Sequence, residues 1–505
     1  MRRLPARQIV APPLPEARLF RPVSAKAEKH AHRRRPWRDN IEALTMAIVM
    51  AVMLKYFIVE AYKIPTGSMQ PTLMGWVSDV GPESCNDRLL VDKLSYHLRD
   101  PERFEIVVFK YPLDRSKNFI KRLCGMPGEQ FRIHDGDLWT RKDDSQEWQI
   151  LRRPKPVQEA QWKVLDRRQA RYASWKPDAG ARGWKMDGRA HVEASGSGSV
   201  TLPNDGGSVL DRYTDGYPGR MGELIEQSML RNRRLALGGT NAVGDLRLTG
   251  SVTAAADCKF VRVQFREGDW HYTLEMPGPA APPDARARIS VRDEASETAS
   301  ATASVSTHLR AGHATAFSAQ NMDDRLELDF DSLHLELDIP GQSEQRSSFG
   351  LAVEGSAVFD DLETFRDIYY TSDRGQTEFD IPPGHYVMLG DNTQDSADGR
   401  EWSLMQFRWP GSGGKWVRGN SREDYGGNDP SGNPRRVTGE PGGPRLFFRD
   451  EWGELHTFLQ KDAERGETIQ APFVPRDLIV GRALLVFWPN NPFNGLGVWR
   501  LKWAR

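Results

Sequence analysis

The chain has few cysteines and no cysteine or histidine pattern that organises a metal centre. Its 505 residues include three cysteines, Cys85, Cys124 and Cys258, which lie far apart and form no C-x-x-C pair. Three widely spaced cysteines do not predict a disulfide framework. The eleven histidines contain no H-E-x-x-H motif, so metal catalysis has little support. We therefore expect no metal and no cofactor.

The chain also lacks an overall excess of charge of either sign. Lys plus Arg and Asp plus Glu both number 69, so the net charge points to no partner. The charge is unevenly placed, however, because residues 1–38 carry eleven Lys or Arg and only two Glu. Such a basic leader can bind nucleic acid, or it can hold the start of a membrane segment on the cytoplasmic side.

A long apolar run follows the basic leader and decides between these two roles. Residues 43–54 read ALTMAIVMAVML without a charge. The stretch 41–62 has about the length that spans a bilayer at ~1.5 Å per residue. A buried helix of a soluble domain and a cleaved signal peptide are the alternatives, but no A-x-A cleavage pattern follows the run. We therefore predict a transmembrane signal-anchor over 41–62 and no nucleic-acid partner.

The orientation of this segment follows from the arginines in front of it. Four arginines lie between residues 33 and 38, which places the N-terminus in the cytoplasm by the positive-inside rule. We expect residues 1–40 to form a disordered cytoplasmic tail. Everything after residue 62 is then expected on the outer face.

A serine in a tight turn comes directly after the apolar run. Residues 63–73 read KIPTGSMQPTL, in which proline and glycine flank Ser68. A serine is a weak nucleophile until a base takes its proton. By itself the pattern is also typical of an ordinary turn, and no Ser-x-x-Lys pair lies near Ser68. A base must therefore come from elsewhere in the chain.

The stretch 118–129, NFIKRLCGMPGE, provides a candidate base. It is typical of a strand ended by a glycine- and proline-containing turn. With a period of two, Phe119, Lys121 and Leu123 share one face, which should be the buried one. Burial lowers the pKa of a lysine, so Lys121 could act as a neutral base. A lysine that reaches solvent at a sheet edge is the alternative.

A third polar stretch follows an apolar run at residues 387–402, VMLGDNTQDSADGREW. Ser396, Asp398 and Arg400 are spaced two residues apart in this loop. Such a loop can supply a hydroxyl that orients a base, and an Asp–Arg pair that fixes the loop. A solvated turn rich in Asp, Asn and Gly is the alternative.

The order of these motifs resembles that of type I signal peptidases, the membrane-anchored Ser/Lys endopeptidases that remove signal peptides. The resemblance covers residues 41 to about 140, 382–402 and 473–490. It implies that Ser68 is the nucleophile, that Lys121 is the general base, and that Thr66 joins the Ser68 backbone N–H in the oxyanion hole. It also implies three supporting roles. Ser396 forms a hydrogen bond with the base lysine. Asp398 and Arg400 form a pair that Arg122 could join, and Asp391 and Asn392 shape the site.

One position departs from the pattern of this family. The family usually has S-x-D-S-R, and here Gly399 stands in place of the second serine. We expect this change to shift local hydrogen bonding rather than to abolish activity. A catalytically silent, membrane-anchored binding protein and a related Ser/Lys peptidase with specialised substrates are the alternative functions.

The resemblance also implies the partners and the location. The expected partners are preproteins with signal peptides and small residues at positions −1 and −3, together with the lipid bilayer. The expected location is the inner membrane of a bacterium.

The fold is expected to be mainly β. We predict a transmembrane helix, an all-β signal-peptidase catalytic core and a large inserted domain that resembles a β-sandwich. The expected boundaries are 63–140, 381–409 and 473–505 for the core, 141–380 for the insert, and 410–472 for a Gly/Pro-rich surface excursion. The insert should be β-rich from about residue 240, while residues 150–240 give no assignable pattern. It is either a binding module for an unknown ligand or a structural embellishment.

Overall fold

The computed structural model describes most of the chain after residue 35. The described ranges are 36–77, 84–217, 219–232, 238–294, 301–340, 346–372, 375–422, 432–439, 441–488 and 502–505. The chain divides into two compact units, residues 1–54 and residues 55–505. The predicted disordered tail of residues 1–40 lies outside the described residues, except that residues 36–40 are helical.

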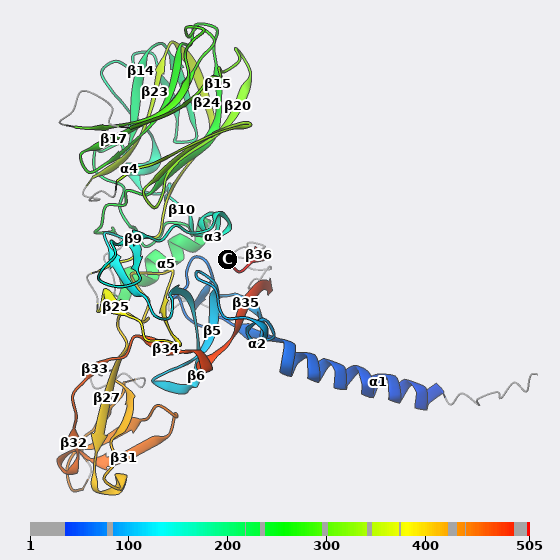
Figure 1. The fold of residues 1–505 in the computed structure, drawn as a ribbon, viewed down its shortest axis with the longest axis vertical. Coiled ribbons are helices and arrows are strands. Elements are labelled where there is room, and N and C mark those ends of the chain that lie inside the picture. Colours follow the sequence, from blue (N-terminus) through cyan, green and yellow to red (C-terminus); the bar gives the residue numbers. More distant parts are fainter. Residues whose placement is uncertain are drawn as a thin grey trace, which may run out of the picture. The chain divides into compact units, whose positions relative to one another are not determined.

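Helix α1 (Pro36–Met53) forms the described part of the N-terminal unit (Figure 1). A π-helical turn, Leu54–Ile58, follows it, and strand β1 (Val59–Lys63) begins directly after that turn. The prediction of one helix over 41–62 is therefore wrong at its C-terminal end, because Val59–Lys63 pairs with strand β4 (Arg88–Asp92). Among the described residues, no helix combines the length and the hydropathy needed to cross a membrane.

The core sheet of the second unit joins segments from both ends of the sequence. Its strand order is β1-β4-β35-β5-β6-β26-β34, and β36 pairs with β35. The remaining strands are β5 (Ile106–Tyr111), β6 (Asp114–Gly125), β26 (His385–Leu389), β34 (Phe473–Pro475), β35 (Ile479–Trp488) and β36 (Lys502–Trp503). Figure 1 shows the late strand β35, in red, beside the early strand β5, with which it pairs.

Both faces of this sheet are buried, which explains its nearly continuous apolar strands. Val107 and Phe109 of β5 pack with Leu123 on one side. Ile106 and Val108 pack with another cluster on the other side. A strand covered on both faces needs apolar residues at successive positions, as in IVVF.

A smaller sheet lies where the chain enters and leaves the insert. Its order is β25-β7-β8-β9, with β25 (Glu378–Asp380), β7 (Gln130–His134), β8 (Asp137–Arg141) and β9 (Gln149–Ile150). Phe131 and Phe379 are buried in its apolar cluster. Short elements complete the core: β2 (Gly75–Val77), β3 (Ser84–Asn86), α2 (Ser95–Leu98) and a 3-10 turn at Arg476–Leu478.

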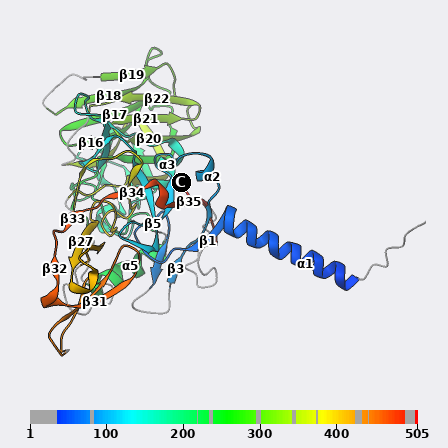
Figure 2. The same ribbon diagram turned by 60° about the horizontal axis from the view of Figure 1, so that its bottom comes forward.

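The insert consists of two antiparallel sheets that share one hydrophobic core (Figure 2). One has the order β12-β13-β24-β15-β20-β21-β22, with β10 paired to β24, and the other has the order β11-β14-β23-β16-β17-β18-β19. The first contains β10 (Lys163–Val164), β12 (Lys185–Asp187), β13 (His191–Ser195), β15 (Leu246–Ala254), β20 (Ala314–Asn321), β21 (Arg325–Phe330), β22 (Leu333–Asp338) and β24 (Ser356–Arg366). The second contains β11 (Lys176–Pro177), β14 (Gly198–Leu202), β16 (Phe260–Glu267), β17 (Trp270–Pro277), β18 (Ala287–Asp293), β19 (Ala301–Val305) and β23 (Ser347–Glu354).

The strands of the insert begin well before residue 240, where the sequence predicted them. Strands β13 and β14 already pair with β24 and β23. Their alternation is carried by small residues such as Ala194, so it gives a weak signal in the sequence. The same region holds the helices α3 (Lys155–Gln161), α4 (Ala170–Ala173) and α5 (Gly219–Asn232).

The described part of the predicted Gly/Pro-rich excursion at 410–472 contains short strands, which follow β27 directly before it. The elements here are β27 (Ser403–Arg408), β28 (Val417–Asn420), β29 (Arg435–Val437), β30 (Arg445–Arg449), β31 (Leu455–Leu459), β32 (Glu464–Arg465), β33 (Ile469–Gln470) and 3-10 turns at Pro410–Ser412 and Gln460–Asp462. Phe407, Phe448 and Phe458 form its buried cluster. Glycines and prolines among the described residues of the segment therefore mark turns between short strands.

Candidate active site

Ser68 and Lys121 meet although they are 53 residues apart in the sequence. Ser68 lies in the turn between β1 and β2, and Lys121 lies in β6. The Lys121 Nζ donates a hydrogen bond of 2.5 Å to the Ser68 Oγ. At this distance the two atoms are in direct hydrogen-bond contact, as a base and the nucleophile that it activates must be.

The environment of Lys121 favours the neutral amine. Its side chain is 3% exposed. Burial lowers the pKa of Lys121 to about 8, although the charge of Asp398 acts in the opposite direction. Phe119 and Leu123, two residues away on either side, belong to one apolar cluster, as the alternation of the strand predicted. With this pKa about a tenth of the amine is unprotonated at pH 7, far more than for an ordinary lysine.

The loop after β26 fastens the turn that carries Ser68. The Asn392 backbone N–H donates to the Ser68 carbonyl at 3.1 Å, and the Asn392 Nδ2 donates to the Gly67 carbonyl at 2.9 Å. A Cβ on Gly390 would lie 2.5 Å from the Ser68 carbonyl oxygen. The loop therefore needs glycine at this position to approach the Ser68 backbone so closely.

Two buried ion pairs hold this loop in place. Arg122 binds Asp391 through two bonds, Nε to Oδ1 at 2.8 Å and Nη2 to Oδ2 at 2.6 Å. Arg400 binds Asp398 in the same bidentate way, at 2.9 and 2.8 Å. Arg122 thus does not join the Asp398–Arg400 pair as predicted. Its side chain leaves the strand on the face opposite Lys121 and meets Asp391 there.

Ser396 and Thr66 lie near Ser68, but the structure shows neither a hydrogen bond from Ser396 to Lys121 nor an oxyanion contact of Thr66. The Ser396 Oγ is buried and has no hydrogen-bond partner among the described residues. It sits beside Gly390, because a Cβ there would lie 2.0 Å from the Ser396 Oγ. Thr66 is exposed. The roles of Ser396 as the partner of Lys121 and of Thr66 in an oxyanion hole therefore stay predictions.

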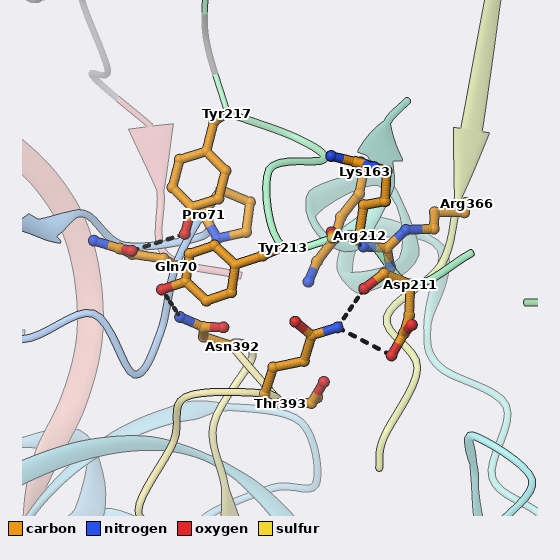
Figure 3. A pocket seen from close by; sticks show the side chains of 11 residues that line it. Gln70, Pro71, Lys163, Asp211, Arg212, Tyr213, Tyr217, Arg366, Asn392 and Thr393 are labelled. Atoms are coloured by element: carbon orange, nitrogen blue, oxygen red, sulfur yellow. Dashed lines mark hydrogen bonds between the residues drawn. The ribbon is translucent and has the colours of Figure 1, made fainter. Parts of the chain in front are cut away.

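A segment of the insert also reaches the turn that carries Ser68, which sequence reasoning missed. Figure 3 shows Tyr213 beside Asn392, whose Nδ2 donates to the Tyr213 hydroxyl at 2.9 Å. The Tyr217 hydroxyl donates to the Gln70 Oε1 at 2.7 Å. Both tyrosines come from the stretch RYTDGYPG at 212–219, where paired aromatics within a Gly/Pro turn are the available signal.

A second buried lysine lies in the same region. The Lys163 Nζ donates to the Asp391 carbonyl at 3.3 Å. Burial lowers the pKa of Lys163 to about 8, and the nearby charge of Arg366 acts in the same direction. Lys163 and Tyr213 therefore connect the insert to the loop that holds Ser68.

Comparison with known proteins gives a match in two separate parts. Residues 37–176 and 339–408 match the family described as "Signal peptidase, peptidase S26". The first part contains Ser68 and Lys121, and the second contains the loop from Asp391 to Arg400.

Curated relatives match mainly this catalytic portion. The "Probable signal peptidase I-2" of Synechocystis is 40% identical over 109 residues, which are 20% of this chain and 45% of that protein. The "Signal peptidase I" of Pseudomonas fluorescens is 39% identical over 97 residues, which are 17% of this chain and 31% of that protein. The chain thus spans less than half of the length of these two relatives.

Similarity to solved structures is weak. The carbohydrate-binding module CBM66 from Bacillus subtilis has 13% identity and a TM-score of 0.23, with 38% of this chain and 94% of that chain covered. A TM-score this low supports no inference about the insert.

Proposed function

Since the chain belongs to the signal peptidase I family (peptidase S26), with the family domain split by an insertion, we propose that it is a serine endopeptidase. The proposed reaction is removal of N-terminal signal peptides from exported preproteins. The observation that carries this proposal is the 2.5 Å contact between the Lys121 amine and the Ser68 hydroxyl. A buried amine in direct contact with a serine is the arrangement that acyl transfer needs.

In the proposed mechanism, neutral Lys121 takes the proton of Ser68 as the Ser68 Oγ attacks the scissile carbonyl. The Ser68 backbone N–H and the Thr66 hydroxyl stabilise the oxyanion, and each well-placed donor contributes roughly 3–4 kcal/mol. Protonated Lys121 then gives its proton to the leaving amine. The neutral amine that results activates the water that hydrolyses the acyl-enzyme. Burial of Lys121 replaces the third acidic group that other serine peptidases use.

The proposed supporting groups keep this geometry fixed. Asn392 donates hydrogen bonds to the carbonyls of Gly67 and Ser68. The Arg122–Asp391 and Asp398–Arg400 ion pairs hold the loop that carries Asn392. Small displacements of a nucleophile reduce rate strongly, so rigid support matters for this reaction.

The proposed place of cleavage is the outer face of the cytoplasmic membrane of a bacterium, with the N-terminus in the cytoplasm. The exposed apolar surface of helix α1 supports the proposal that the N-terminal unit lies in an apolar environment such as the bilayer. Its large apolar side chains are more than half exposed, among them Leu44, Met46 and Met50. Association with the membrane pellet after carbonate washing tests this location.

Cleavage of a preprotein with small residues at positions −1 and −3 tests the activity. We expect the wild type to cleave and the variants Ser68→Ala and Lys121→Ala to be inactive. Lys110→Ala is the matched control, because Lys110 is an exposed lysine on the adjacent strand β5. Equal cleavage by all four proteins would contradict the proposal. A folded wild type that cleaves nothing would favour a silent binding protein that acts through its inserted domain.

A further inference from the structure

Three carboxylates from distant parts of the chain converge between the core and the insert. Asp137 begins β8, Asp245 directly precedes β15, and Asp323 lies in the turn between β20 and β21. One oxygen from each lies within 4.8 Å of the others. Asp245 and Asp323 are 3% and 2% exposed, whereas Asp137 is half-buried.

Arg153, the basic residue beside this cluster, already forms two ion pairs. The Arg153 Nη2 contacts the Asp323 Oδ1 at 2.6 Å and also binds the Asp367 Oδ2. Asp137 and Asp245 form no ion pair within the described ranges. One guanidinium thus faces four carboxyl groups in a buried place, where each ionised carboxylate is costly unless a cation meets it.

Buried oxygen atoms beside the cluster also lack partners. The Asp367 Oδ1 has no hydrogen-bond partner among the described residues, and Asp367 is 1% exposed. Its charge acts on both Asp137 and Asp245, so this carboxylate lies beside them. The Oδ1 of Asn321, two residues before Asp323, is likewise buried and unpartnered in the described part of the chain. Such lone pairs are costly in a folded protein unless a donor or a cation meets them.

The chemistry of these groups selects the kind of cation. The nearby donors are carboxylate and amide oxygens, with no imidazole or thiolate among the three convergent residues. Hard divalent cations prefer oxygen ligands, and Ca²⁺ accepts six to eight of them in flexible geometry. Mg²⁺ demands a near-ideal octahedron and retains water, which suits a buried site with many carboxylates less well.

We propose that Asp137, Asp245 and Asp323 bind one Ca²⁺ ion, with Asp367 as an adjacent oxygen donor. The site joins the core strand β8 to the ends of neighbouring strands, β15, β20 and β21, in one sheet of the insert. It also lies where the chain enters the insert near Arg153 and leaves it at Asp367, which follows β24. The ion therefore stabilises the attachment of the insert to the core and takes no part in bond cleavage.

Calcium titration of the full chain, solubilised in detergent and stripped with EDTA, tests this site. Calorimetry should show one Ca²⁺ bound per chain with a Kd below about 1 mM, and weaker binding of Mg²⁺. The melting temperature should rise by about 3 °C at a Ca²⁺ concentration of 100 times Kd. This readout does not depend on peptidase activity.

The variants Asp245→Asn and Asp137→Asn should lose Ca²⁺ binding and the thermal shift. Asp137 is half-buried, so its substitution provides a second variant if the fold does not tolerate a change at Asp245. Asp329→Asn is the matched control, because Asp329 belongs to a separate cluster with Glu327 and His334 in the same insert. Absence of binding by the wild type at 5 mM, on the order of the weakest calcium sites, would overturn the proposal. Binding that both variants retain would overturn it as well.

Discussion

Removal of the Arg122–Asp391 ion pair should destabilise the catalytic core strongly. Both side chains are 0% exposed and share two hydrogen bonds of 2.8 and 2.6 Å. Removal of one partner leaves the other as an uncompensated buried charge, which costs about 3–5 kcal/mol. We therefore expect Asp391→Leu and Arg122→Met each to lower the free energy of unfolding by about 3–5 kcal/mol.

The double variant distinguishes this cause from loss of packing. Replacement of both charged groups by apolar ones removes the unpaired charge, so Arg122→Met/Asp391→Leu should recover most of the lost stability. Urea unfolding followed by circular dichroism measures these free energies. The exposed pair Arg408–Glu464 is the matched control, and Glu464→Leu should cost less than about 1 kcal/mol. Additive losses in the double variant would refute the reasoning.

Three further predictions concern the site and its surroundings. Lys121→Met should abolish cleavage yet raise the free energy of unfolding at pH 7 by up to about 3 kcal/mol. The reason is that burial lowers the native pKa of Lys121 from 10.5 to about 8, so the buried lysine reduces stability as pH falls through this range. A loss of stability in urea unfolding would contradict this. Gly399→Ser, which restores the serine usual in the family, should lower stability by about 1–3 kcal/mol without raising activity, since its Cβ would lie 3.0 Å from the Pro472 carbonyl oxygen; Gly238→Ser, in open space, is the control in the same unfolding assay. Tyr213→Phe removes the bond to Asn392 and should lower kcat/KM about three- to tenfold, while Tyr172→Phe, which loses a comparable bond to the Leu210 N–H, should leave kcat/KM unchanged.

The contact between Ser68 and Lys121 was predicted from the order of several short motifs, because each stretch alone also fits an ordinary turn or strand. The turn around Ser68 and the alternation of Phe119, Lys121 and Leu123 are visible in short stretches of sequence. Strand periodicity then places the lysine on an apolar face, and burial follows from that. The lowered pKa of Lys121 agrees with this reasoning.

The partners of the supporting residues were not predictable in the same way. Arg122 pairs with Asp391 rather than with Asp398, and this choice depends on how two strands distant in sequence meet. Tyr213 comes from a region without periodicity, so no pattern connected it to Asn392. The end of helix α1 was misjudged because the short stretch Val59–Tyr62 fits either a helix or a strand, and in the structure it pairs with β4.

The pH dependence of preprotein cleavage tests the central claim most directly, that buried Lys121 is the base for Ser68. For the wild type, kcat/KM should rise about tenfold per pH unit below pH 8 and level off above it, because only the neutral amine accepts the Ser68 proton and the pKa of Lys121 is about 8. The control Lys110→Ala should show the same midpoint. A profile that is flat between pH 6 and pH 10, or a midpoint that stays at about 8 in a Lys121→Ala variant with residual activity, would contradict the account.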